Sequence, residues 1–133
     1  MRPEGWEDRL LEEIERHRQL PFEYGTSDCL TFAVDCANAI TIGNVMANQR
    51  NYSTQAGAFK ALKNAGFDNV GDALASEFEE IPPAFAGRGD LGVIEGDEAI
   101  VAVVFVGAHV VGKEQPGGVQ QVSRSLVSRA FRV

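Results

Sequence analysis

Residues 21–36 of this 133-residue chain read PFEYGTSDCLTFAVDC. Tyr24 and the glycine after it are typical of a turn, and either Ser27 or Asp28 can be the N-cap of a helix that follows. The apolar residues beyond it recur at helical spacing, so the stretch predicts a helix over residues 28–40. Cys29 then lies in the first turn, where backbone N–H groups stabilise an anion and lower the pKa of a thiol.

The same periodicity predicts three further helices in the first half of the chain. They cover residues 5–18, residues 53–66 and a short stretch around residues 70–78. In the second of these, Ser53 is the expected N-cap, and the side chains expected to face inward are Ala58, Phe59, Leu62 and Ala65.

The second half of the chain predicts β-strands. The run AIVAVVFV at residues 99–106 is the most apolar and is rich in β-branched residues, so it should be a central strand. Other strands are expected at residues 91–94, 109–111, 119–122 and 130–133. Helices followed by strands indicate an α+β fold, with three or four helices before a small antiparallel sheet of about five strands. The length favours one domain over residues 1–133.

Charge and hydropathy argue against several classes of protein. The net charge of −7 disfavours a nucleic-acid groove, which needs a basic stripe. No apolar run approaches about 20 residues, so no membrane span is expected. The acidic, amphipathic N-terminus is unlike a signal peptide, which suggests a protein that is cytoplasmic at synthesis or part of a larger particle. No cofactor-binding motif is present.

Several motifs together carry a family resemblance. PFEYGTSDC and its helix are followed by RNYST, by AGRGDL and by the apolar run that ends in Gly107. In order and spacing these resemble the NlpC-type cell-wall cysteine peptidases of the papain-like superfamily, and most of all a group of phage and prophage proteins related to them. The likeness extends from Trp6 to Phe131. It implies a papain-like fold, with other phage tail or assembly proteins, or a peptide-like ligand, as partners, and a virion-associated location.

The resemblance also implies a site, and this sequence departs from it. Cys29 matches the nucleophile, and Tyr24, Asp28 and Asp90 would belong to the cleft. The catalytic histidine would fall on or near Val101, where no histidine stands. A cysteine peptidase needs a base to form the thiolate and an acid to protonate the leaving amine, and valine supplies neither.

Two histidines remain as alternative bases. His17 closes the first predicted helix, and His109 follows the apolar strand, where only a shifted register would bring it to Cys29. A zinc site made of both histidines, Cys29 and Cys36 is disfavoured, because the cysteines lie about two helical turns apart. No metal is therefore expected.

Three functions stay open from the sequence. The first is a phage-associated peptidase fold without its base that binds a partner or ligand in its cleft. The second is an active thiol hydrolase or amidase on peptidoglycan-like or acyl substrates, with Cys29 as nucleophile and His109 or His17 as base. The third is an assembly subunit in which the cleft has no role.

Overall fold

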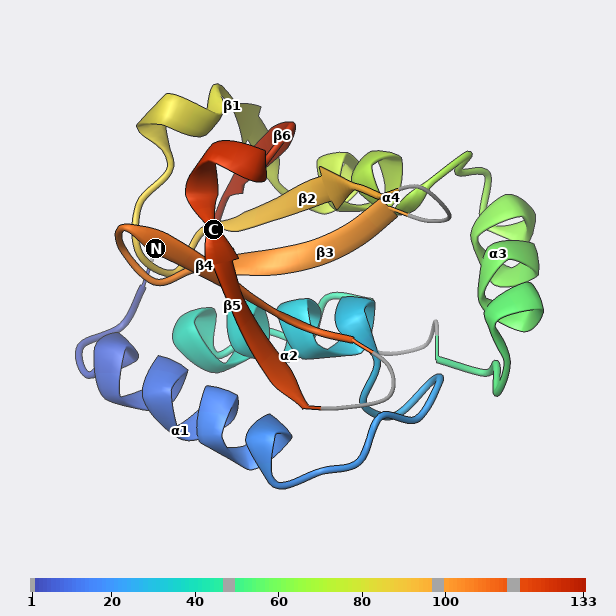
Figure 1. Cartoon of the computed structure of the whole chain (residues 1–133), viewed down its shortest axis with the longest axis horizontal. Helices are drawn as coiled ribbons and strands as arrows, with labels where there is room; N and C mark the ends of the chain where they lie inside the picture. The colour runs from blue at the N-terminus through green and yellow to red at the C-terminus, as the bar shows by residue number, and fades with distance from the viewer. Residues whose placement is uncertain (1, 47–49, 97–99, 115–117) are drawn as a thin grey trace.

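Four α-helices precede a six-stranded sheet along the chain, and the computed structural model describes residues 2–46, 50–96, 100–114 and 118–133 (Figure 1). The helices are α1 (Trp6–Arg18), α2 (Cys29–Thr41), α3 (Gln55–Asn64) and α4 (Val70–Glu77). The strands are β1 (Glu79–Ile81), β2 (Leu91–Glu95), β3 (Ile100–Phe105), β4 (His109–Lys113), β5 (Val119–Ser123) and β6 (Arg129–Arg132). The fold is therefore α+β, as the sequence predicts. No helix in these ranges is long and apolar enough to cross a membrane.

The sheet has the strand order β1-β6-β2-β3-β4-β5, and all neighbours are antiparallel. The apolar run forms β3 in the interior of the sheet, which confirms the predicted central strand, although Ala99 lies outside the described residues. The expected count of five strands was one too low. The additional strand, β1, is short and begins with two exposed glutamates, so it lacks the apolar alternation that marks a strand in sequence.

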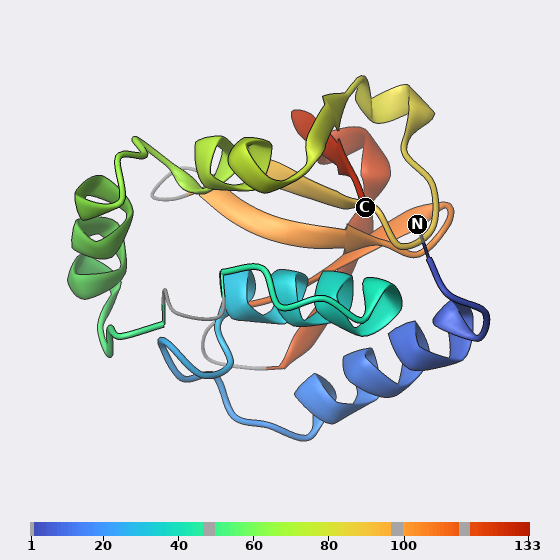
Figure 2. The ribbon, with the colours of Figure 1, turned by 180° about the vertical axis from the view of Figure 1, so that it is seen from behind.

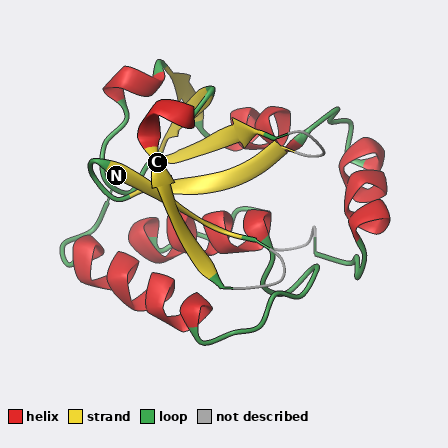
Figure 3. Ribbon diagram, in the orientation of Figure 1, coloured by secondary structure: helices red, strands yellow, loops and turns green. Residues whose placement is uncertain are grey.

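The central helix α2 separates α1 from the sheet, as Figures 2 and 3 show. Its N-terminus is fixed by a capping box, in which Asp28 accepts a hydrogen bond from the Thr31 amide and the Thr31 hydroxyl accepts one from the Asp28 amide. One side of α2 packs on α1 and the other on β3 and β4. Side chains buried in this main core include Leu10, Ile14, Phe32, Ala37, Leu74, Ala102 and Val104.

The opposite face of the sheet has a second, smaller core. Two short 3-10 helices, η1 (Pro83–Phe85) and η2 (Arg124–Leu126), lie beside it. Arg124 connects them, because its guanidinium stacks on Phe105 at 4.9 Å and donates to the backbone carbonyls of Pro83 and Ala86, and also to that of Gly107 in the turn after β3. Both faces of β3 are therefore covered, which explains why its sequence is apolar throughout.

Helix α3 differs from its prediction. It is capped by Thr54 rather than Ser53, and of the four residues expected to face inward only Leu62 is buried. Ala65 is exposed, and Phe59 retains 46% of its accessible surface. Apart from Leu62, which belongs to the main core, the apolar face of α3 borders a cavity, and the helix stands apart from the α1, α2 and sheet layers (Figure 1).

Candidate functional site

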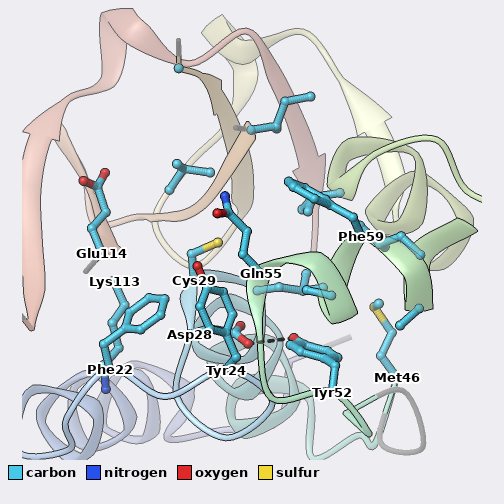
Figure 4. Close-up of a pocket in the computed structure, with 18 of the residues that line it drawn as sticks. Phe22, Tyr24, Asp28, Cys29, Met46, Tyr52, Gln55, Phe59, Lys113 and Glu114 are labelled. Carbon is cyan, nitrogen blue, oxygen red and sulfur yellow. Dashed lines mark hydrogen bonds between the residues drawn. The ribbon is translucent and has the colours of Figure 1, made fainter. Parts of the chain in front are cut away.

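A cavity of about 450 Å³ opens between the N-terminus of α2, the inner face of α3 and the ends of β3 and β4 (Figure 4). Its volume is within the range of small-molecule sites. Its apolar lining includes Phe22, Leu30, Phe59, Leu62, Val70 and Ile100. Its polar lining comprises Tyr24, Asp28, Cys29, Tyr52, Gln55, Lys113 and Glu114. Three of the residues expected from the sequence, Tyr24, Asp28 and Cys29, are thus brought together here.

Cys29 is the first residue of α2, and its side chain points into the cavity. Burial raises the pKa of its thiol to about 11, although the backbone amides of Ala102 and Leu30 act in the opposite direction. The negative charge of Asp28 adds to the rise. Near neutral pH the group is therefore a protonated thiol, and the position at a helix N-terminus does not suffice to ionise it.

Both carboxylate oxygens of Asp28 accept hydrogen bonds that stabilise the local structure. One accepts the Thr31 amide of the capping box at 2.8 Å. The other accepts the Gly25 amide at 2.8 Å and the Tyr52 hydroxyl at 2.7 Å (Figure 4). Asp28 therefore ties the start of α2 both to the preceding turn and to the segment that leads into α3.

The strand opposite Cys29 presents small, apolar side chains. Successive side chains of a strand point to opposite faces, and Ala102 belongs to the main core with α2. Val101, the residue matched to the catalytic histidine, packs with the second core on the far face and also reaches the edge of the cavity. Neither residue offers a group that can exchange a proton with the thiol.

His17 is fully buried between α1 and α2 and belongs to a charged network rather than to the cavity. Its Nε2 lies 2.8 Å from Asp35, and its ring meets Phe32 edge-on at a centroid distance of 5.1 Å. Asp35 also accepts hydrogen bonds from Arg16 and Arg50. This network joins α1 and α2 to the segment before α3, and His17 does not line the cavity.

His109 lies at the other end of β3 from Cys29. It is exposed at the start of β4, beside the hairpin turn, and is opposite Ser123. The β3 residue near this turn, Phe105, is three residues from Ala102, or about 10 Å along a strand. The structure therefore separates both histidines from the thiol of Cys29.

Asp90 also lies outside the cavity lining. It is buried and accepts hydrogen bonds from the Arg2 guanidinium at 2.8 Å, the Val133 amide at 3.0 Å and the Gly87 amide at 2.9 Å. Residues near the two ends of the described chain are joined through this carboxylate.

Four polar residues of the cavity were not predicted: Tyr52, Gln55, Lys113 and Glu114. The first two belong to the stretch that begins RNYST, which carried part of the family resemblance but no assigned role. Lys113 is fully buried, and its ammonium donates to the backbone carbonyl of His17 at 2.8 Å. Burial lowers its pKa, and the positive charge of Arg16 adds to this effect. A lysine at the end of a strand ordinarily faces solvent, so no sequence signal indicated this position.

Potential metal ligands gather at one place among the described residues. Glu13, His17 and Asp35 each offer an atom within 4.8 Å of the others. Arg16 bonds to both carboxylates and Arg50 bonds to Asp35, so arginines already neutralise this cluster. A cation would have to displace them. The cysteines are both free, and within the described ranges they form no ligand cluster with a histidine.

One comparison with known proteins identifies a family. A model described as a domain of unknown function, DUF6950, matches residues 1–133, and the chain belongs to that family. Searches of curated proteins and of solved structures give no match.

Proposed function

We propose that this DUF6950 domain is a catalytically degenerate, papain-like domain of the NlpC type that binds a peptide-like segment of a partner protein in its cleft. In this proposal Cys29 is retained from the peptidase fold, lines the binding site and performs no acyl transfer. The resemblance to phage and prophage proteins makes another tail or assembly protein the expected partner, and the assembled particle the expected location.

The observation that carries the proposal is an open cavity with a thiol at its wall but no histidine beside it. Nucleophilic catalysis by cysteine requires a thiolate and a proton donor for the leaving group. The pKa of Cys29 lies at about 11, and neither histidine of the chain lines the cavity. Loss of a general acid-base partner costs about 10² to 10⁴ in rate. The space for a ligand is nevertheless present.

The arrangement of elements supports the papain-like part of the proposal. A cysteine begins the helix that packs on an antiparallel sheet, and the strand that would carry the histidine lies against it. These are the relations that the resemblance implies between Cys29 and the region of Val101. Fold likeness alone does not establish activity, so the chemistry of the thiol decides between binding and hydrolysis.

The rate of alkylation of Cys29 by iodoacetamide, measured from pH 6 to pH 11, tests this proposal. A Cys36→Ser background removes the second thiol, and Cys29→Ser provides the blank. We expect a midpoint near pH 11. At pH 7 the rate should be roughly 300-fold below that of a free cysteine, whose pKa is about 8.5. His109→Ala and His17→Gln should not change the profile.

Fast alkylation at pH 6 to 7, slowed by either histidine variant, would instead support the hydrolase. Incubation with peptidoglycan fragments would then be expected to release products that Cys29→Ser does not release. If Cys29 is not alkylated near neutral pH and no products are released from the peptidoglycan fragments, the result supports the binding domain.

A further inference from the structure

We propose that the cavity beneath α3 receives one large, uncharged, apolar side chain of an extended peptide, and that α3 is the wall that contacts it. This inference rests on the proposed function and specifies the ligand of the same site. It follows from the packing of α3, from the charges around the cavity and from two polar side chains that line it.

The packing of α3 indicates that its partner is missing. The segment before the helix is held by the bond between Tyr52 and Asp28, and the bond from the Phe67 amide to the Leu62 carbonyl closes its last turn. Within the helix, Leu62 is the one buried side chain. An amphipathic helix is stabilised mainly by burial of its apolar face. A ligand that filled the cavity would cover Phe59 and the alanines beside it.

The charges around the cavity exclude an acidic ligand. Lys113 is the cation among the described lining residues, and its buried ammonium donates to the His17 carbonyl. The exposed carboxylate of Glu114 stands at the rim, and the whole chain carries a net charge of −7. A fatty-acid carboxylate or a lipid phosphate would therefore meet repulsion, whereas a neutral or basic peptide would not.

The free polar groups suit an amide. Tyr24 and Gln55 line the cavity, and neither side chain makes a hydrogen bond to the other residues drawn in Figure 4. A hydroxyl and a carboxamide can each donate and accept, which matches the paired N–H and C=O of a peptide backbone. The apolar wall then selects the side chain, and these two groups select the backbone that carries it.

The test uses ¹⁵N-labelled protein and small neutral probes followed by NMR. N-acetyl-phenylalanine amide and N-acetyl-leucine amide should shift the amides of Cys29, Leu62 and Ile100. N-acetyl-aspartate amide should not. Phe59→Asp should weaken binding of the apolar probes at least tenfold, and Gln55→Ala should weaken it severalfold. The matched control is Phe85→Asp, because Phe85 is 72% exposed and does not line the cavity, and it should change affinity less than twofold.

Other outcomes would overturn the inference. Decanoate that binds more tightly than the neutral amides would identify an acyl chain as the ligand. Equal effects of Phe59→Asp and Phe85→Asp, or the absence of shifts around the cavity, would exclude this site. Alkylation of Cys29 separates this failure from failure of the proposed function. If Cys29 is not alkylated near neutral pH and no probe binds, only the proposed ligand is wrong. If Cys29 is alkylated fast near neutral pH, the proposed binding domain is wrong, whether or not the probes bind.

Discussion

The bond between Tyr52 and Asp28 supports a sharp prediction, because the chain contains two tyrosines that differ in this respect. Both line the cavity, but only the Tyr52 hydroxyl donates to the Asp28 carboxylate. Tyr52→Phe removes that bond and retains the ring. Tyr24→Phe removes a hydroxyl that bonds to none of the residues drawn in Figure 4, so it is the matched control.

The structure sets the size of the effect. The bond is 2.7 Å long, and its acceptor is the carboxylate of Asp28, which is 3% exposed. A hydrogen bond to a charged group contributes about 1.5–3 kcal/mol to the free energy of unfolding. After the substitution Asp28 still accepts two backbone amides, which places the loss near the middle of that range, at about 2 kcal/mol. For a chain of this length such a loss lowers Tm by roughly 7 °C. Tyr24→Phe should cost less than about 0.5 kcal/mol.

Urea unfolding followed by the fluorescence of the single tryptophan, Trp6, measures both variants. Tyrosinate absorbance gives a second measurement, because burial, with the charge and hydrogen bond of Asp28, raises the pKa of Tyr52 well above its ordinary value. The folded state then binds this proton more tightly than the unfolded state. The stability it contributes is complete below about pH 10 and declines as the pH rises further. Tyr52→Phe should reduce that alkaline decline. Equal costs for the two variants would refute the role of the bond.

Two further predictions concern the anchors around α2. Asp35→Asn should destabilise the fold by about 2 kcal/mol, because His17 and Arg50 lose a charged acceptor. Burial raises the pKa of Asp35, but hydrogen bonds from His17 and Arg50 outweigh it, so this pKa lies below its ordinary value. The stability that the Asp35 carboxylate contributes is therefore present above about pH 4 and is lost as the pH falls further. Across a thermal unfolding series from pH 2 to pH 7, the Tm of the variant should change less than that of the original protein. Gly25→Ala should cost at least about 3 kcal/mol, because φ is 85° and the new methyl carbon would lie 2.2 Å from the Tyr52 carbonyl oxygen. Gly66→Ala, with positive φ but open space, should cost about 1 kcal/mol in the same urea titration, and equal losses at the two glycines would contradict the clash.

The elements that the sequence predicts well are those with strong local signals. Asp28 caps α2 as its position suggests, and the β-branched run forms β3 inside the sheet. The face of α3 was not predictable, because its apolar spacing is the same whether it borders a core or a cavity. Strand β1 depends on pairing with β6, which is about 50 residues away, and leaves no local pattern.

The candidate site was predicted only in part, for a related reason. Three of its residues lie close together in sequence: Tyr24, Asp28 and Cys29. One turn and one helix N-terminus are enough to bring their side chains to the same cavity. Lys113 reaches the cavity wall through tertiary packing, and its buried ammonium bonds to a carbonyl that is 96 residues away. Asp90, expected in the cleft, is instead bonded to Arg2 and the Val133 amide. Contacts of that range cannot be inferred from spacing along the chain.

The motif that suggested a peptidase can be explained without catalysis. Gly25 takes a positive φ that brings its backbone against the Tyr52 carbonyl, and Asp28 caps α2 and accepts the Tyr52 hydroxyl. Ser27 donates to the Pro21 carbonyl and so closes the turn before the helix. Each of these residues is required by the local structure, whatever the thiol does. The motif therefore gives no evidence of catalysis by itself. Under the function proposed above, the pKa of about 11 at Cys29 and the placement of both histidines are the observations that support binding over hydrolysis.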